Sequence, residues 1–364
     1  EMCIRDRSEN NTKDSPDFAS IGEFWADPLD GKKIEASLSE YAELANRPEE
    51  FYINKDIIEF KNDYQNFLEE KKRHVAKYTL PFTQTLPKFL GKPINFEFRA
   101  GELTVFAGEN GSGKSMLLGQ IGLHLVSRGA TLYIASLEMS PLRTLDRMMT
   151  QTFCSESKRV INADDMNLFF ERFKKHITIA DLTSKITPDQ LLRLLDAAVN
   201  YGGADVLIVD SLLMCVQDDM NKNETDYLME RLVEFAKINK VHVIVVAHCR
   251  KNNETTNYSV FNAASKDAIK GSSNITNVAF NVFVLAYDKS KTQKLAEGKS
   301  VDDSKPDFVL NLCKQRNGPF EGYISLWRDS ASLNFCVSND RIPNRTWLET
   351  VESTQEETEI EPYF

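Results

Sequence analysis

The sequence lacks the features of a membrane-spanning or secreted protein. No apolar run among its 364 residues reaches the length of roughly 18 residues that a membrane-spanning helix requires. No basic segment followed by an apolar stretch stands near the start, so we do not expect secretion. The six cysteines form no C-x-x-C pair, which excludes a zinc ribbon or a disulfide scaffold and fits a reducing compartment. We therefore expect a cytoplasmic protein that has no membrane partner.

The sequence also lacks an excess of basic residues. It has 44 basic and 54 acidic side chains and a formal net charge of −10. This excludes a protein that nucleic acid coats over its whole outer surface, but it allows one local basic channel. Six glutamates and no basic residue fall in the last 16 positions, so the rest of the chain carries only −4. They are Glu349, Glu352, Glu356, Glu357, Glu359 and Glu361.

The length allows two or three domains, and an apolar fraction of 41% is enough for a large core. We predict that residues 1–20 are disordered, and the first seven resemble translated adaptor sequence. Residues 21–85 form a small N-terminal helical segment, in which the charged helix 55–77 is either a linker or a plain surface helix. Residues 86–340 form the main domain. Residues 341–364 are an acidic tail, either a solubilising segment or a partner-docking peptide.

Short apolar runs alternate with amphipathic segments through the main domain. The expected strands are 103–107, 131–135, 206–209 and 241–247, and the expected helices are 114–127, 141–153, 188–200 and 224–239. This alternation predicts an α/β fold with a mostly parallel sheet and helices on both faces. Later runs at 280–286, 308–312, 323–327 and 332–335 predict a C-terminal antiparallel extension. We interpret the lysine-rich segment between them as a surface loop, with Lys289, Lys291, Lys294, Lys299 and Lys305.

A complete phosphate-binding motif, G-x-x-x-x-G-K-[ST], lies between the first strand and the first helix. It comprises Gly108, Glu109, Asn110, Gly111, Ser112, Gly113, Lys114 and Ser115. Glycines allow backbone N–H groups to surround phosphate oxygens at a helix N-terminus. Lys114 is expected to reach the β- and γ-phosphates, and the Ser115 hydroxyl to hold Mg²⁺. The motif predicts a protein that binds ATP, or another NTP or dNTP, together with Mg²⁺.

An acidic partner for this motif ends a later strand. Asp210 directly follows the apolar run 206–209. A carboxylate at the end of a buried strand, beside a phosphate-binding loop, is suited to hold Mg²⁺. We therefore predict that Ser115 and Asp210 together form the metal site.

Three further motifs stand in a fixed order after the phosphate-binding loop. Ser136-Leu137-Glu138-Met139 follows the second strand, Val245-Val246-Ala247-His248 ends a later one, and Lys314-Gln315-Arg316-Asn317-Gly318 lies near the C-terminal end. Together with the loop, they resemble the RecA-type ATPase domain of the DnaB-like and Twinkle-like hexameric replicative helicases. The resemblance spans about residues 86–336 and is similar to the helicase half of phage primase–helicases. It implies a RecA-like P-loop NTPase fold.

The resemblance also implies a role for each motif. Glu138 would polarise the attacking water, and Arg147 fits the spacing of the arginine that follows this glutamate in the family. His248 would sense the γ-phosphate. Arg316 would act as an arginine finger on the nucleotide of a neighbouring subunit, with Lys314 as its companion. The implied catalytic residues are thus Glu138, Lys114, His248, Arg316 and Lys314.

The segment 267–273 resembles the DNA-contacting loop of the same family, with Lys270 in place of an arginine. The implied DNA-binding residues are Arg250, Lys266, Lys270, Gly271 and Ser272. Lysine side chains and backbone N–H groups can contact phosphates without reading bases. The family often has an acidic residue a few positions later, where this chain has Phe280. A solvated loop is the alternative interpretation.

The whole pattern implies an ATP-dependent DNA helicase that functions in DNA replication. It would form a homo-oligomeric ring, with a hexamer expected, and move 5′ to 3′ along single-stranded DNA. Its tail, which ends in Tyr363 and Phe364, would dock on a replicative polymerase or primase, in a bacterial cell or a phage-infected host. Two alternatives stay open: a RecA/RadA-type recombinase or mediator, and a non-unwinding P-loop regulatory ATPase.

Overall fold

The computed structural model describes residues 77–82, 88–89, 92–93 and 96–348, with gaps at 159, 183, 217–221, 251–259, 272 and 319, together with Tyr64 and Gln65. The chain divides into two units, Glu1–His74 and Val75–Phe364, and the fold below belongs to the second. The predictions for residues 1–20, for nearly all of helix 55–77, for Ser272 and for the positions after 348 lie outside the described residues. No helix in the described part is long and apolar enough to cross a membrane.

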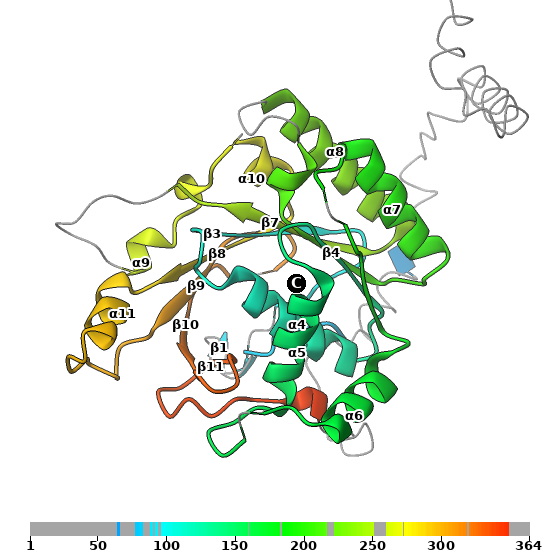
Figure 1. The fold of residues 1–364 in the computed structure, drawn as a ribbon. Coiled ribbons are helices and arrows are strands. Elements are labelled where there is room, and N and C mark those ends of the chain that lie inside the picture. The colour runs from blue at the N-terminus through cyan, green and yellow to red at the C-terminus, as the bar shows by residue number, and fades with distance from the viewer. Residues whose placement is uncertain are drawn as a thin grey trace, which may run out of the picture. The chain divides into compact units, whose positions relative to one another are not determined.

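A nine-stranded sheet, in the order β11-β10-β9-β8-β3-β7-β6-β4-β5, forms the centre of the fold (Figure 1). Its parallel part consists of β3 (Leu103–Gly108), β4 (Leu132–Ser136), β5 (Ile177–Ile179), β6 (Val206–Asp210), β7 (His242–His248) and β8 (Asn281–Tyr287). An antiparallel extension consists of β9 (Phe308–Gln315), β10 (Gly322–Arg328) and β11 (Phe335–Cys336). A separate hairpin pairs β1 (Lys88–Phe89) with β2 (Lys92–Pro93). The predicted fold class is confirmed.

Helices cover both faces of the sheet. One face packs against α4 (Lys114–Ser127), α5 (Pro141–Phe153) and α6 (Ala163–Phe173), and the other against α7 (Pro188–Asn200) and α8 (Lys222–Asn239) (Figure 1). Side chains that alternate along a strand supply the two cores. On β3, Phe106 joins the core under α4, and Val105 joins the core under α7 and α8. The shorter helices are α9 (Val260–Ala263), α10 (Asn274–Val278) and α11 (Lys289–Ala296).

Local sequence signals set the start of α7. Thr187 Oγ1 accepts a hydrogen bond from the Gln190 N–H at 3.2 Å, and Gln190 Oε1 accepts one from the Thr187 N–H at 2.9 Å. This reciprocal pair satisfies two of the backbone donors that a helix N-terminus leaves without partners. Pro188 follows at the first helical position, where it loses no backbone bond. The predicted helix start is confirmed.

The lysine-rich segment after β8 differs from the sequence expectation. The prediction of a plain surface loop is wrong here, because the segment begins with helix α11 and buries one of its lysines. Lys291 is only 6% exposed, and its Nζ lies 2.7 Å from Asp307 Oδ1. A buried ammonium group requires such a partner, and the partner comes from a distant part of the sequence.

The last predicted strand, 332–335, is also shorter than expected. Asp329 Oδ2 accepts a hydrogen bond from the Ser332 N–H at 3.1 Å, which holds the chain in a turn. Leu333 adopts the left-handed φ of 62° within this turn. Only Phe335 and Cys336 are left to pair with β10.

The packed domain extends beyond the predicted limits of 86 and 340. Leu80 and Phe82 are buried in the same core as α4 and α5. Trp347 is fully buried in that core as well, although the sequence groups it with the acidic tail. Both ends of the domain therefore contribute apolar side chains to its stability.

Phe283 lies at the centre of the aromatic packing in this core. Its ring stacks on Phe106 at 4.7 Å and meets the edge of Phe96 at 4.8 Å. Because the site is fully buried, we expect Phe283→Ala to lower the free energy of unfolding by about 3–5 kcal/mol. Leu142→Ala, on an exposed position of α5, is the control and should change it by less than about 0.5 kcal/mol. Urea denaturation of both variants checks this, and equal effects would contradict it.

Candidate functional site

The phosphate-binding loop connects β3 to α4 in a conformation that requires glycine. Gly111 and Gly113 have φ values of 78° and 90°, in the left-handed region that side chains disfavour. A Cβ atom on Gly108 would lie 2.6 Å from the carbonyl oxygen of Leu285. The glycines thus let the backbone turn sharply and deliver the first residues of α4 to the end of β3.

Lys114 occupies the middle of this loop. Its Nζ donates hydrogen bonds to the carbonyl oxygens of Gly108 and Glu109, both at 2.9 Å. Burial lowers the pKa of Lys114. Nearby, the buried hydroxyl of Ser112 has no hydrogen-bond partner among the described residues. A buried cation and an unsatisfied hydroxyl at a helix N-terminus are suited to receive phosphate oxygens.

Ser115 and Asp210 provide oxygen atoms for a metal ion. Ser115 Oγ donates a hydrogen bond to Asp210 Oδ2 at 2.5 Å. Asp210 is buried, and this burial raises its pKa. Hydroxyl and carboxylate oxygens are ligands that Mg²⁺ prefers, and a divalent cation would compensate the buried charge. No group of three His, Cys, Asp or Glu residues in the described ranges could hold a metal alone, so the donor set fits an ion that is shared with phosphate and water.

The parallel register of the sheet brings the predicted residues to one edge. Ser136 lies opposite Asp210, and Gly108 lies opposite His248. Glu138 follows β4 by two residues, so the turn after that strand reaches the same edge. Sequence reasoning placed these groups at strand ends, and the structure brings them together.

Glu138 is held by two side chains from neighbouring strands. His248 Nε2, which carries the proton in this arrangement, donates to Glu138 Oε1 at 2.9 Å. The Ser211 hydroxyl donates to the same oxygen, and His248 Nε2 lies 3.3 Å from Ser211 Oγ. The hydrogen bond from His248 lowers the pKa of Glu138 to about 2, despite partial burial, and the bond from Ser211 adds to this. Glu138 is therefore a carboxylate at neutral pH.

Sequence reasoning did not identify Ser211. This residue follows Asp210 through a cis peptide bond and is fully buried. Its position directly after a strand-end carboxylate was the available signal, since a hydroxyl there faces the same sheet edge. Ser211 links the Glu138 carboxylate to the strand that carries Asp210.

Two pockets adjoin the loop. A small one is lined by Ser115, Asp210, Met139 and Arg147, so Arg147 lies beside the metal-binding oxygens. A larger cavity of about 810 Å³ begins at Gly111. Its lining includes Tyr287, Phe308, Arg328, Arg341 and Arg345. This volume is in the range of small-molecule sites, about 300–1,000 Å³.

Lys314 and Arg316 lie away from the loop of their own chain. Lys314 Nζ donates to the carbonyl oxygens of Thr276 and Asn277 at 2.7 and 2.9 Å, and Arg316 Nη2 donates to Asn277 O at 2.6 Å. The Arg316 guanidinium also lies over the Phe280 ring, 5.3 Å from its centroid. Burial, with added repulsion from Arg316, lowers the pKa of Lys314 to about 8. Both cations thus bind the C-terminal end of α10.

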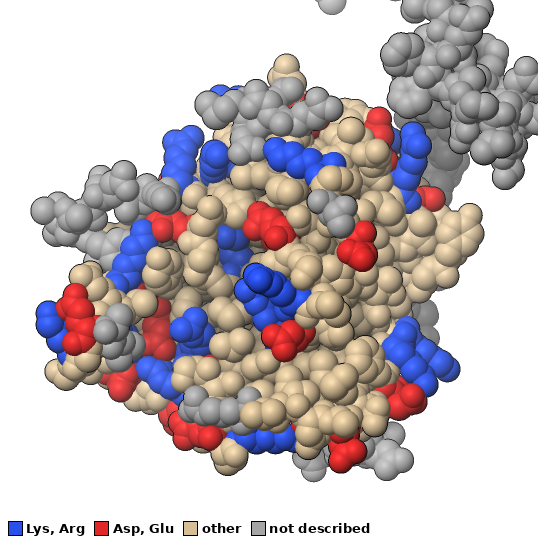
Figure 2. Space-filling view, viewed as in Figure 1, with Lys and Arg blue, Asp and Glu red and all other residues tan. Residues whose placement is uncertain are grey.

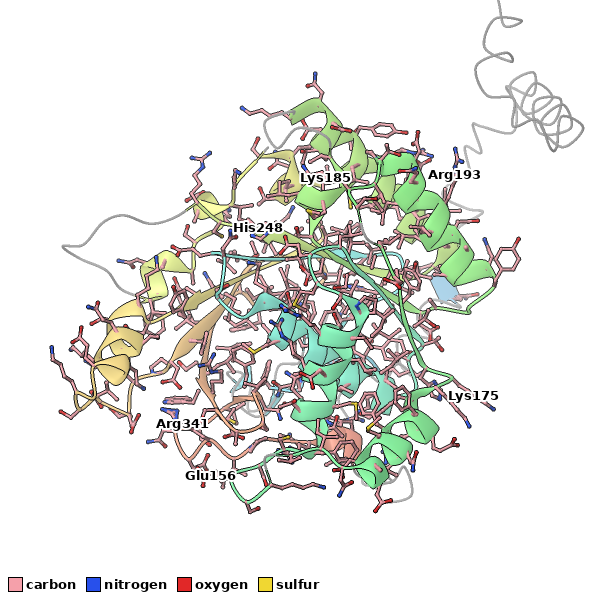
Figure 3. All side chains as sticks on the ribbon, in the orientation of Figure 1. Glu156, Lys175, Lys185, Arg193, His248 and Arg341 are labelled. Carbon is pink, nitrogen blue, oxygen red and sulfur yellow. The ribbon has the colours of Figure 1, made fainter. Side chains whose placement is uncertain are left out.

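The candidate DNA loop is hydrogen-bonded to the end of β7. The Lys270 N–H donates to His248 O, and the Arg250 N–H donates to Ala268 O, both at 2.7 Å. Lys266 begins an exposed 3₁₀ turn, Lys266–Ala268, and Gly271 has a left-handed φ of 112°. Figure 3 shows His248 beneath the elements that lead into α10. The side chains predicted to contact DNA therefore follow the residue predicted to sense phosphate.

Comparisons with known proteins agree with this architecture. Residues 94–254 match a family model described as an AAA domain. A solved structure of a DnaB-like replicative helicase, determined with its interactions with primase, matches 87% of this chain and 74% of its own, with a TM-score of 0.62 and 14% identity. The solved ATPase domain of a second helicase matches 76% of this chain and 97% of its own, with a TM-score of 0.60 and 14% identity. The resemblance to DnaB-like helicases is confirmed at the level of the fold.

The hydrogen bond from His248 generates a prediction about ionisation. His248→Ala removes the main donor to Glu138, so the pKa of that carboxyl should rise from about 2 toward the ordinary value near 4.5. Carboxyl ¹³C NMR titration measures this, with Glu138→Gln to assign the signal. The stability that the low pKa contributes is present above about pH 4.5 and is lost as the pH falls through about 2. An unchanged pKa in the variant would show that His248 is not the cause.

Proposed function

We propose that this protein is an ATP-dependent replicative DNA helicase that forms a ring, a hexamer, and moves 5′ to 3′ along single-stranded DNA. One observation carries the proposal. The cluster of Lys114, Ser115–Asp210 and Glu138–His248 lies at one sheet edge, and the backbone of His248 is bonded to the loop that carries Lys270. An ATPase site and a basic loop share one strand end on a fold that resembles helicase ATPase domains.

The P-loop residues bind the triphosphate. Backbone N–H groups of residues 108–115 surround its oxygens, and Lys114 exchanges its bonds to Gly108 and Glu109 for bonds to phosphate. Ser115 and Asp210 hold Mg²⁺, which when bound neutralises charge between the β- and γ-phosphates. The cavity that begins at Gly111 has room for the base and ribose.

Glu138 acts on the attacking water. Its carboxylate is ionised at neutral pH, so it can accept a hydrogen bond from water placed in line with the γ-phosphate. His248 and Ser211 orient this carboxylate from the next two strand ends. A γ-phosphate near His248 Nε2 would compete for its proton, which gives His248 the means to sense the nucleotide.

Arg316 and Lys314 act on the nucleotide of a neighbouring subunit. Both bind carbonyl oxygens of α10 in their own chain and contact no P-loop residue in the described part. Their bonds to neutral carbonyls can be exchanged for stronger bonds to phosphate. Hydrolysis would then depend on ring assembly.

The loop after β7 contacts the DNA backbone through Arg250, Lys266, Lys270, Gly271 and Ser272. The hydrogen bond between Lys270 N–H and His248 O provides a direct mechanical connection between the nucleotide site and this loop. Charges of both signs are interspersed on the face seen in Figure 2, which supports a local contact rather than a broad basic surface.

The remaining segments are assigned from the sequence. Residues 86–340 act as the motor domain. Helix 55–77, within the N-terminal segment 21–85, docks on the adjacent subunit, and the tail 341–364 docks on a polymerase or primase through Tyr363 and Phe364. Deletion of 55–77 should impair ring formation, whereas removal of the last two residues should spare ATPase activity.

A forked-DNA assay tests the proposed function. The wild type should unwind forks that carry a 5′ single-stranded tail, and Lys114→Ala should unwind none because it cannot hold the phosphates. Unwinding is measured as strand release with ATP and Mg²⁺. ATP hydrolysis without unwinding of either polarity would contradict the helicase proposal and favour a regulatory ATPase. Filaments on DNA in electron micrographs would favour a recombinase.

A mixing experiment tests the action of Arg316 on its neighbour. Lys114→Ala retains the finger and loses its own site, whereas Arg316→Ala retains the site and loses the finger. Each variant alone should be at least about 100-fold less active in ATP hydrolysis. An equimolar mixture should regain a measurable fraction of wild-type activity, because some interfaces then combine an intact site with an intact finger. The absence of any gain on mixing would argue for action within one chain.

A further inference from the structure

The phosphate-binding loop carries a carboxylate that is paired with a lysine from a distant element. Lys289 Nζ lies 2.6 Å from Glu109 Oε2. Glu109 is the second residue of the loop, and Lys289 is the first residue of α11. The side chains are 33% and 16% exposed for Lys289 and Glu109, so solvent screens the pair only in part. The sequence interpretation treated Lys289 as part of a surface loop, and the structure places it on the P-loop.

An acidic residue at this position opposes the binding of a triphosphate. The carbonyl oxygen of Glu109 already accepts a hydrogen bond from Lys114, so its carboxylate lies on the residue next to the phosphate-binding backbone. Its negative charge also acts on Lys114, where it partly offsets the lowering of the lysine pKa by burial. Like charges in a partly buried site repel more strongly than in bulk water. An unpaired Glu109 would therefore weaken the attraction of the loop for phosphate.

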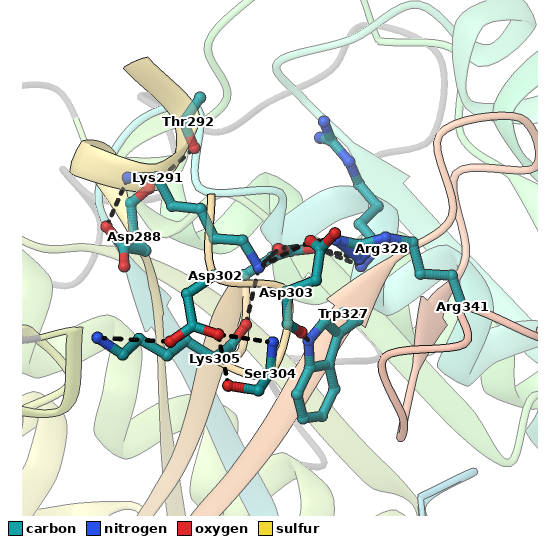
Figure 4. A network of polar contacts seen from close by, with 11 residues as sticks. Asp288, Lys291, Thr292, Asp302, Asp303, Ser304, Lys305, Trp327, Arg328 and Arg341 are labelled. Carbon is teal, nitrogen blue, oxygen red and sulfur yellow. Dashed lines mark hydrogen bonds and ion pairs between the residues drawn. The ribbon is translucent and has the colours of Figure 1, made fainter. Parts of the chain in front are cut away.

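Helix α11 is anchored, so Lys289 has a defined position. Figure 4 shows Lys291, two residues further along, in a network of polar contacts with the segment 302–307 and Arg341. Lys291 Nζ donates to Lys305 O at 2.8 Å and pairs with Asp307. Arg341 binds Asp303 and Asp307 at 3.0 and 2.9 Å. These contacts hold α11 on the C-terminal extension, and Figure 3 shows Arg341 well separated from His248.

We propose that Lys289 is a positioning residue that neutralises Glu109 and so keeps the phosphate-binding loop attractive to a nucleoside triphosphate. The α11 segment thereby becomes part of the nucleotide site without touching the reacting atoms. The inference rests on the proposed function only in that the loop binds a triphosphate. It depends neither on DNA nor on ring assembly.

Binding of a fluorescent ATP analogue with Mg²⁺ to the full chain tests this role. Lys289→Met keeps the length of the side chain and removes its charge, so the Kd should rise about tenfold. The KM for ATP should rise in parallel, while kcat changes by less than about twofold, because the effect is on binding. Lys294→Met is the matched control, since Lys294 is an exposed lysine on the same helix, and it should bind as the wild type does. Thermal denaturation checks that all variants are folded.

Two further variants separate neutralisation from direct phosphate contact. Lys289→Arg keeps the charge and should keep the Kd within about threefold of the wild type. Glu109→Gln should tighten binding, and the double variant Glu109→Gln/Lys289→Met should recover most of the affinity that Lys289→Met loses. The difference between wild type and Lys289→Met should also shrink as salt is raised from about 0.05 to 0.5 M.

The outcomes are distinct. Equal affinity of wild type and Lys289→Met would overturn this proposal and leave the proposed function intact. Failure of Glu109→Gln to restore binding would also overturn it, because Lys289 would then act on the phosphate itself. If the wild type bound no nucleotide, the proposed function would fail first and this inference with it.

Discussion

The parallel register of β4, β6, β7 and β3 is the constraint on which the site depends. It sets Ser136 opposite Asp210 and Gly108 opposite His248, so four strand ends meet at one edge of the sheet. Buried apolar side chains on both faces fix this register, because a shift by one residue would turn each strand's core residues to the wrong face. The chemistry of Glu138 and Asp210 thus relies on packing beneath α4 and above α8.

Contacts at this edge connect the nucleotide site to two other parts of the chain. One connection runs from the His248 backbone to the loop that holds Lys270. The other runs from the phosphate-binding loop through Glu109 and Lys289 to α11 and the C-terminal extension. Arg316 and Lys314 hold the end of α10, which follows the Lys270 loop. Short hydrogen bonds and ion pairs therefore join segments that lie far apart in the sequence.

Much of the fold could be predicted because its signals are local. Continuous apolar runs marked the central strands, and the spacing of glycines and Lys114 marked the loop between β3 and α4. Asp210, Glu138 and His248 each follow an apolar run, so their common edge was predictable. Ser211 was not, because a single hydroxyl forms no pattern and its role depends on neighbouring strands. The position of α11 was not either, since its lysines are held by Asp303, Asp307 and Arg341 from elsewhere in the chain.

The central claim is that the Lys114, Asp210 and Glu138 cluster is a triphosphate site completed by a second subunit. A structure of the assembled protein with Mg²⁺ and a non-hydrolysable ATP analogue tests it most directly. The account predicts that Lys114 Nζ leaves Gly108 O and Glu109 O for phosphate oxygens, that a metal lies between Ser115 and Asp210, and that Arg316 of the next subunit faces the γ-phosphate. A nucleotide bound elsewhere, or bound with Arg316 still on Asn277 in every subunit, would contradict it.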